Sequence, residues 1–88
     1  MVYEAVEFIE LKEKPEPIQS VLGEFDTETA AVERARAART AFLEGGSDDY
    51  AWWVVRKQGA TLAEFIADSK SDKEFVLDLR SGQLVELV

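Results

Sequence analysis

Hydrophobic and polar residues alternate along the first part of the chain in the manner of two β-strands. Residues 2–11 are rich in Val, Ile, Tyr and Phe, and a charged segment with two prolines follows them. The alternation breaks at Phe8-Ile9, and a β-bulge there would keep the apolar side chains on one face. Residues 18–25 form a second predicted strand, which we pair with the first as an antiparallel hairpin.

In the next segment, apolar residues recur every three to four positions, which predicts a helix over residues 27–44. Asp26 or Thr27 would cap its start, and Gly45 would end it. The predicted buried stripe consists of Ala31, Ala35, Ala38 and Phe42, flanked by Val32 and Leu43. Because alanine has little bulk, we expect this helix to lie close to a sheet whose own side chains are large.

The second half of the chain is dominated by predicted strands. The apolar run YAWWVVRK at residues 50–57 is the clearest of them. Residues 60–69 are ambiguous, because their apolar positions fit both a short helix and strand alternation. The turn-forming sequence KQG before them favours the strand. Residues 74–79 and 83–88 form a predicted hairpin.

The loop of this last hairpin decides which residues face each other. A three-residue loop with Gly82 in the left-handed conformation places Leu77 opposite Val85. A two-residue turn would instead place Leu77 opposite Glu86. The first register keeps one face of the hairpin apolar, so it is the one that we predict.

The predicted elements follow one another in the order ββαβ(β or short α)ββ. This order indicates an α+β fold, a mainly antiparallel sheet with one long helix, at about residues 27–44, packed on one face. With 88 residues, the chain should form a single domain over residues 1–88. Its 47% hydrophobic and 32% charged residues are typical of a globular domain.

The chemistry available to the chain is limited, because it contains no histidine and no cysteine. The commonest general base, thiolate nucleophiles and Cys/His metal sites are therefore excluded. Ser47 beside Asp48-Asp49 has only the composition of an ordinary loop, and no phosphate-binding or calcium-binding loop motif occurs. We predict no catalytic, cofactor-binding or metal-binding residues and a protein that is not an enzyme.

The charge is strongly acidic, since 18 Asp and Glu residues against 10 Lys and Arg residues give a net charge of -8. Such a chain should repel nucleic acid, and it has no apolar run long enough to span a membrane. Its acidic start lacks the basic character of a secretory signal, so we expect a cytoplasmic protein. Residues 1–28 could dock a basic protein through an acidic face of Glu7, Glu10 and Glu13, as an adaptor, an inhibitor or a nucleic-acid mimic.

One stretch of the chain resembles a known DNA-binding family. Residues 21–38, VLGEFDTETAAVERARAA, resemble the strand-to-helix passage of plant AP2-type domains. The strands of that family carry arginines and tryptophans into the DNA groove, whereas the corresponding strands here carry Glu4, Glu7, Glu10 and Glu24. The resemblance therefore implies a shared way of entering a helix and no shared DNA binding.

The adjacent indoles of Trp52 and Trp53 are the feature that points to function. Neighbours on a strand face opposite sides of a sheet, so only one of these indoles can lie under the helix. The other should then join an apolar patch that suits a partner. We predict a non-catalytic interaction module that forms a homodimer through its sheet, with Tyr50, Trp52, Trp53 and Val54 as candidate interface residues.

Overall fold

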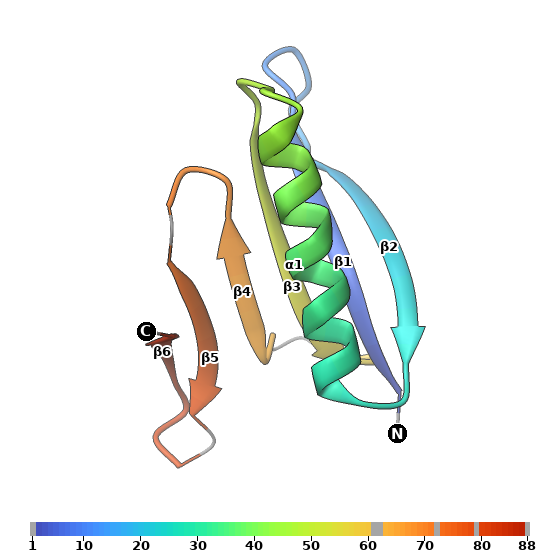
Figure 1. The fold of residues 1–88 in the computed structure, drawn as a ribbon, viewed down its shortest axis with the longest axis vertical. Coiled ribbons are helices and arrows are strands. Elements are labelled where there is room, and N and C mark those ends of the chain that lie inside the picture. The colour runs from blue at the N-terminus through green and yellow to red at the C-terminus, as the bar shows by residue number, and fades with distance from the viewer. Residues whose placement is uncertain (1, 61–62, 72, 79, 88) are drawn as a thin grey trace.

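A computed structural model describes residues 2–60, 63–71, 73–78 and 80–87 of the chain. The elements are β1 (Tyr3–Glu10), β2 (Ile18–Phe25), α1 (Glu28–Glu44), β3 (Tyr50–Lys57), β4 (Phe65–Asp68), β5 (Glu74–Asp78) and β6 (Gln83–Leu87) (Figure 1). The ambiguous segment contains a strand, β4, which pairs antiparallel with β3. Residues 61 and 62 of that segment, and the predicted strand ends at residues 79 and 88, lie outside the described part of the chain.

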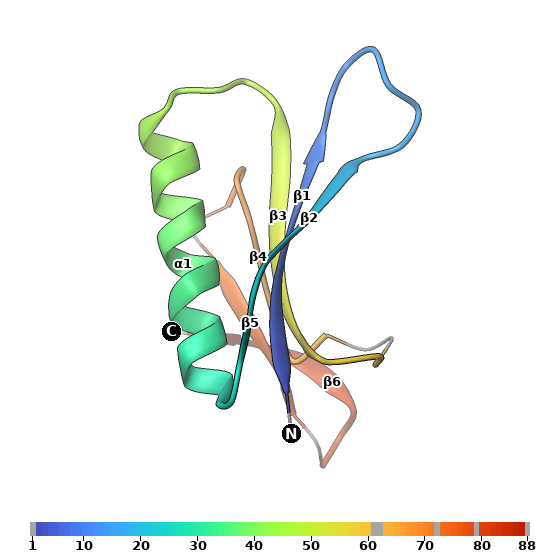
Figure 2. The same cartoon turned by 90° about the vertical axis from the view of Figure 1, so that its right-hand side faces the viewer.

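The six strands form one antiparallel sheet in the order β2-β1-β3-β4-β5-β6. Because β2 and β3 both lie antiparallel to β1, they run parallel to each other, and such strands need a crossover connection. The helix α1 is this crossover, and it lies on one side of the sheet (Figure 2). The predicted α+β class, with one helix on an antiparallel sheet, is confirmed.

The helix begins as its sequence predicts. The side chain of Thr27 accepts a hydrogen bond from the backbone N–H of Ala30 at 3.2 Å, so Thr27 is the N-cap. Gly45 follows the last helical residue, and Gly46 has a φ of 69°, a left-handed conformation that favours glycine. The prediction that Leu43 flanks the buried stripe is wrong, because Leu43 is 43% exposed.

The core lies between the alanine stripe of the helix and the large side chains of β3 and β4. Ala31 and Ala35 have no exposed surface, and the same holds for Trp53, Val55 and Phe65 beneath them. The ring of Phe42 meets the indole of Trp53 edge to face, with centroids 5.5 Å apart. Small residues on the helix therefore oppose bulky residues on the sheet, as expected.

The predicted bulge at Phe8-Ile9 is wrong. The pairing of β1 with β3 runs without interruption, and Phe8 and Ile9 face opposite sides of the sheet. The irregularity lies in β2, where Leu22 is the extra residue opposite β1. Both faces of the sheet offer apolar contacts, since Ile9 packs against the core and Phe8 stacks on Trp52 on the far side.

The predicted register of the last hairpin is also wrong, because Leu77 lies opposite Leu84 and not Val85. The reason is a local closure of the loop. The carbonyl oxygen of Asp78 accepts a hydrogen bond from the backbone N–H of Gly82 at 2.8 Å, and Gly82 has a φ of 73°. This bond makes Asp78 the last paired residue of its strand, and the apolar residues of the hairpin are divided between its two faces.

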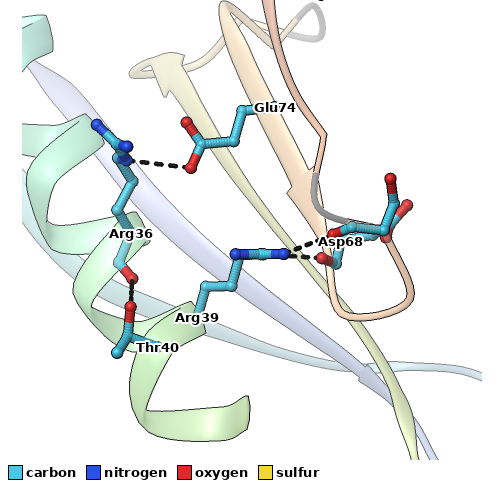
Figure 3. Close-up of polar contacts among 6 residues, drawn as sticks. Arg36, Arg39, Thr40, Asp68 and Glu74 are labelled. Carbon is cyan, nitrogen blue, oxygen red and sulfur yellow. Dashed lines mark hydrogen bonds and ion pairs between the residues drawn. The ribbon is translucent and has the colours of Figure 1, made fainter. Parts of the chain in front are cut away.

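The helix covers only part of the sheet. Its backbone approaches β1, β2, β3 and β4 but, among the described residues, neither β5 nor β6. Two arginine side chains extend beyond this limit (Figure 3). Arg39 donates hydrogen bonds to the carbonyl oxygens of Asp68 and Ser71, and Arg36 forms an ion pair of 3.1 Å with Glu74. The hairpin of β5 and β6 is thus tied to the helix without lying under it.

Candidate interaction surface on the open face of the sheet

The side of the sheet away from α1, here called the open face, is mainly apolar. Strand alternation and the pairing register determine which side chains it carries. Its apolar members are Val6, Phe8, Val21, Tyr50, Trp52, Val54, Ile66, Phe75, Leu77 and Leu84. Figure 2 shows no helix on this side of the sheet. Val6 and Val54 are buried, with 0% and 7% exposure, and the other members of the list are partly or well exposed. Exposed apolar side chains gathered on one face mark a candidate interaction site.

Phe8, Tyr50 and Trp52 form an aromatic cluster at one end of the open face. The rings of Phe8 and Trp52 stack with centroids 5.0 Å apart and planes 6° from parallel. The ring of Tyr50 lies 5.6 Å from that of Trp52. All three side chains remain partly exposed. The stacked pair and the tilted ring of Tyr50 therefore form one continuous aromatic cluster.

The hydroxyl of Tyr50 anchors this cluster to the adjacent strand β4. It donates a hydrogen bond to Oδ2 of Asp68 at 3.3 Å. Burial raises the pKa of Tyr50, and the negative charge of Asp68, its hydrogen bond and the charge of Glu10 raise it further. The phenol therefore stays protonated at neutral pH and keeps its role as donor.

A hollow of about 260 Å³ lies beside the aromatic cluster. It is lined by Ile66, Ala67, Asp68, Phe75 and Leu84. The cluster and the hollow are neighbours, because Asp68 is the register partner of Trp52 in the adjacent strand. Leu84 on its rim is 49% exposed. The open face thus combines a partly exposed aromatic cluster with a mainly apolar hollow.

The four candidate interface residues do not share one surface. Tyr50 and Trp52 are partly exposed on the open face, and Val54 lies on the same face with 7% exposure. Trp53 faces the helix and has no exposed surface, so it is a core residue and not a surface residue. Alternation places the two indoles on opposite faces, but only the position of the helix decides which one is covered.

The predicted acidic face is divided as well. Glu7 faces the helix side of the sheet, Glu10 lies on the open face, and Glu13 is exposed in the loop between β1 and β2. Glu4 is neutralised by an ion pair of 2.9 Å with Arg56. The acids of residues 1–28 therefore do not form one continuous surface for a basic partner.

A groove on the helix side of the sheet is a feature that sequence reasoning missed. It measures about 410 Å³ and lies between α1 and the strands β1 and β2. Its apolar walls are Ile9, Leu22, Ala37, Ala38, Ala41 and Phe42. Two charged residues, Glu7 and Arg34, also line it. The sequence signal was a glutamate at a helix-facing position of β1, next to the core residues Ala5 and Ile9.

Comparisons with protein-family models, with curated proteins and with solved structures found no match. No helix in the described part of the chain is long and apolar enough to cross a membrane. Within the same residues, no group of three or more acidic side chains is arranged to hold a metal ion. The function must therefore be inferred from the geometry of the chain itself.

Proposed function

We propose that this protein is a non-catalytic, cytoplasmic interaction module that self-associates through the open face of its sheet. In this homodimer, the aromatic cluster of one copy lies in the hollow of the other. The observation that supports this proposal most is that a partly exposed aromatic cluster and a mainly apolar hollow lie side by side on the same face. A two-fold axis between two such faces places each cluster over the partner's hollow, which is the requirement for a self-complementary interface.

The composition of the open face supports this arrangement. Most of its side chains are aliphatic or aromatic, and the Glu4–Arg56 ion pair and Glu10 lie toward its ends. Two further carboxylates lie on this face, Asp68 beside Trp52, where it accepts the hydrogen bond of Tyr50, and Glu86 opposite Phe75. Stable interfaces likewise combine apolar side chains with polar groups that have hydrogen-bond partners. A specific dimer should bury at least about 1,000 Å² in total.

The net charge makes a second, independent prediction about this dimer. Each copy carries -8, so two copies repel each other at long range. Added salt screens that repulsion and should strengthen the dimer. An acidic surface docking a basic protein, the alternative proposal, requires the opposite, because salt would weaken that attraction. The division of the acids between two faces makes this alternative the weaker of the two.

The test uses two neighbouring positions of β6 with matched exposure. Leu84 is 49% exposed on the open face, and Val85 is 46% exposed on the other face. Leu84→Asp places a charge in the hollow and should dissociate the dimer, whereas Val85→Asp should leave it intact. Because both side chains are well exposed, neither change should greatly alter the folding of one copy.

The measurement is the solution mass at high micromolar concentration by light scattering. We expect about twice 9.9 kDa for the unaltered chain and for Val85→Asp, and a value near 9.9 kDa for Leu84→Asp. The proposal is wrong if the unaltered chain is monomeric under these conditions. It is also wrong if the two substitutions weaken the dimer equally.

A further inference from the structure

The groove between α1 and the strands β1 and β2 contains a carboxylate that the fold does not explain. Glu7 lies opposite Trp53 on the helix side of the sheet, where its neighbours in β1 belong to the core. Oε1 of Glu7 accepts a hydrogen bond of 2.9 Å from Nε1 of Trp53. An uncharged glutamine could accept the same bond, so the structural role of this residue does not require its charge.

Glu7 has no cationic partner within ion-pair distance in the described part of the chain. None of the ion pairs formed by the described residues within 4.0 Å includes Glu7. Its side chain is half-buried and lines the groove. A partly desolvated carboxylate is stabilised when a cation approaches it, and a ligand that enters the groove could supply that cation.

Arg34 provides the opposite charge at the same groove. It projects from α1, is exposed, and lines the groove together with three alanines of the helix. It forms no ion pair with Glu7 within 4.0 Å, so the two opposite charges line the same groove without neutralising each other directly. The long side chain of arginine is flexible and can adjust its planar group to a carboxylate.

We infer that this groove binds a small zwitterion with an apolar side chain, that is, a free aliphatic α-amino acid. The ammonium group of the ligand would pair with Glu7, and its carboxylate would pair with Arg34. Its aliphatic part would lie against the alanine wall of the helix and against Ile9 and Leu22. The groove and the open face lie on opposite sides of the sheet, so this inference is independent of the proposed dimer.

Three probes separate the contributions of the two charges. L-leucine carries both, isopentylamine lacks the carboxylate, and 4-methylpentanoate lacks the ammonium group. The readout is the NMR signal of the Trp53 indole N–H, which is bonded to Glu7 and must respond when the carboxylate is engaged. We expect a saturable shift with L-leucine and about tenfold weaker binding of each analogue, the typical effect of losing one charged hydrogen bond.

Two substitutions and one matched control complete the experiment. Glu7→Gln keeps the acceptor for Trp53, and Arg34→Gln alters an exposed helix residue, so both variants should fold. Each should bind L-leucine at least about tenfold more weakly, while Glu10→Gln on the open face should bind as the unaltered chain does. The inference is overturned if L-leucine gives no saturable shift up to about 10 mM. It is equally overturned if isopentylamine binds as tightly as L-leucine, or if the two variants bind normally.

Discussion

The half of the sheet under the helix and the hairpin of β5 and β6 differ in burial far more than in sequence. Trp53, Val55 and Phe65 under the helix have no exposed surface, whereas Leu84 and Val85 in β6 are nearly half exposed, at 49% and 46%. The cause is size. A helix is about 10–12 Å wide and strands are about 4.8 Å apart, so one helix covers two to three strands well. Six strands exceed that width.

This difference separates the part of the chain that holds the fold together from the part that is available to a partner. Hydrophobic stabilisation is proportional to the apolar area removed from water, so most of it comes from the covered half. The hairpin of β5 and β6 contributes apolar side chains to both of its faces and buries few of them in one copy. The hollow of the proposed interface lies in this second region.

The largest expected effect comes from removing a side chain of the covered half. Trp53→Ala should lower the free energy of unfolding by about 3–5 kcal/mol, because it leaves a cavity under the helix. Leu84→Ala in the hairpin should cost within about 0.5 kcal/mol for one copy, because the side chain is already exposed. Urea unfolding followed by circular dichroism measures both values at a concentration low enough to keep the chain monomeric. Similar losses for the two variants would refute the comparison.

The two regions also differ in how far the sequence predicts them. The helix, capped by Asp26 or Thr27, and the strand at residues 50–57 follow from local patterns, and the structure has both elements there, with Thr27 as the cap. The register of the last hairpin does not follow, because the loop bond between Asp78 and Gly82 outweighs the preference for one apolar face. Hydrophobic patterning fixes register only where one face is buried, and neither face of this hairpin lies under the helix.

The candidate sites show the same limit. Tyr50 and Trp52 were expected together because they alternate along one strand, and alternation is a local property. The groove was not expected, since Glu7 and Arg34 lie far apart in the sequence and line the same groove only because the helix crosses over the sheet. A charged residue in a strand is usually assumed to face water. Because β1 packs apolar side chains on both faces, its sequence did not indicate that Glu7 faces the helix.

The second prediction concerns the connection between the two regions. Arg39 is partly buried, and its Nε donates to the carbonyl oxygen of Asp68 at 2.9 Å. Arg39→Met should lower the free energy of unfolding by about 2 kcal/mol, because it leaves the partly buried carbonyl groups of Asp68 and Ser71 without this charged donor. Arg36→Met should cost at most about 1 kcal/mol, since its ion pair with Glu74 involves an arginine side chain that is 59% exposed. Thermal or urea unfolding of both variants provides the test, and a larger loss for Arg36→Met would contradict it.

The smallest expected effect is a change in titration at the border of the two regions, where Tyr50 donates its hydrogen bond to Asp68. Burial and the charge of Asp68 raise the pKa of Tyr50, so the folded chain holds the phenol proton more tightly than the unfolded chain. This difference stabilises the fold in full at pH values below the ordinary tyrosine pKa of about 10. The stabilisation is lost as the pH rises through the raised pKa of Tyr50. Asp68→Asn removes the negative charge and should return the pKa of Tyr50 toward its ordinary value.

Absorbance of the phenolate measures this pKa directly, in a Tyr3→Phe background where Tyr50 is the only tyrosine. The chain that retains Asp68 and the Asp68→Asn variant should titrate at clearly different pH, and stability should decline less steeply above about pH 10 in the variant. Because Tyr50 belongs to the aromatic cluster, the proposed dimer would bury it further. The pKa of Tyr50 should therefore rise with protein concentration in the protein that retains Leu84. It should stay constant in the Leu84→Asp variant. If the pKa of Tyr50 does not change with concentration in either protein, the proposed interface is wrong. The hydrogen bond between Tyr50 and Asp68 would not be affected by that result.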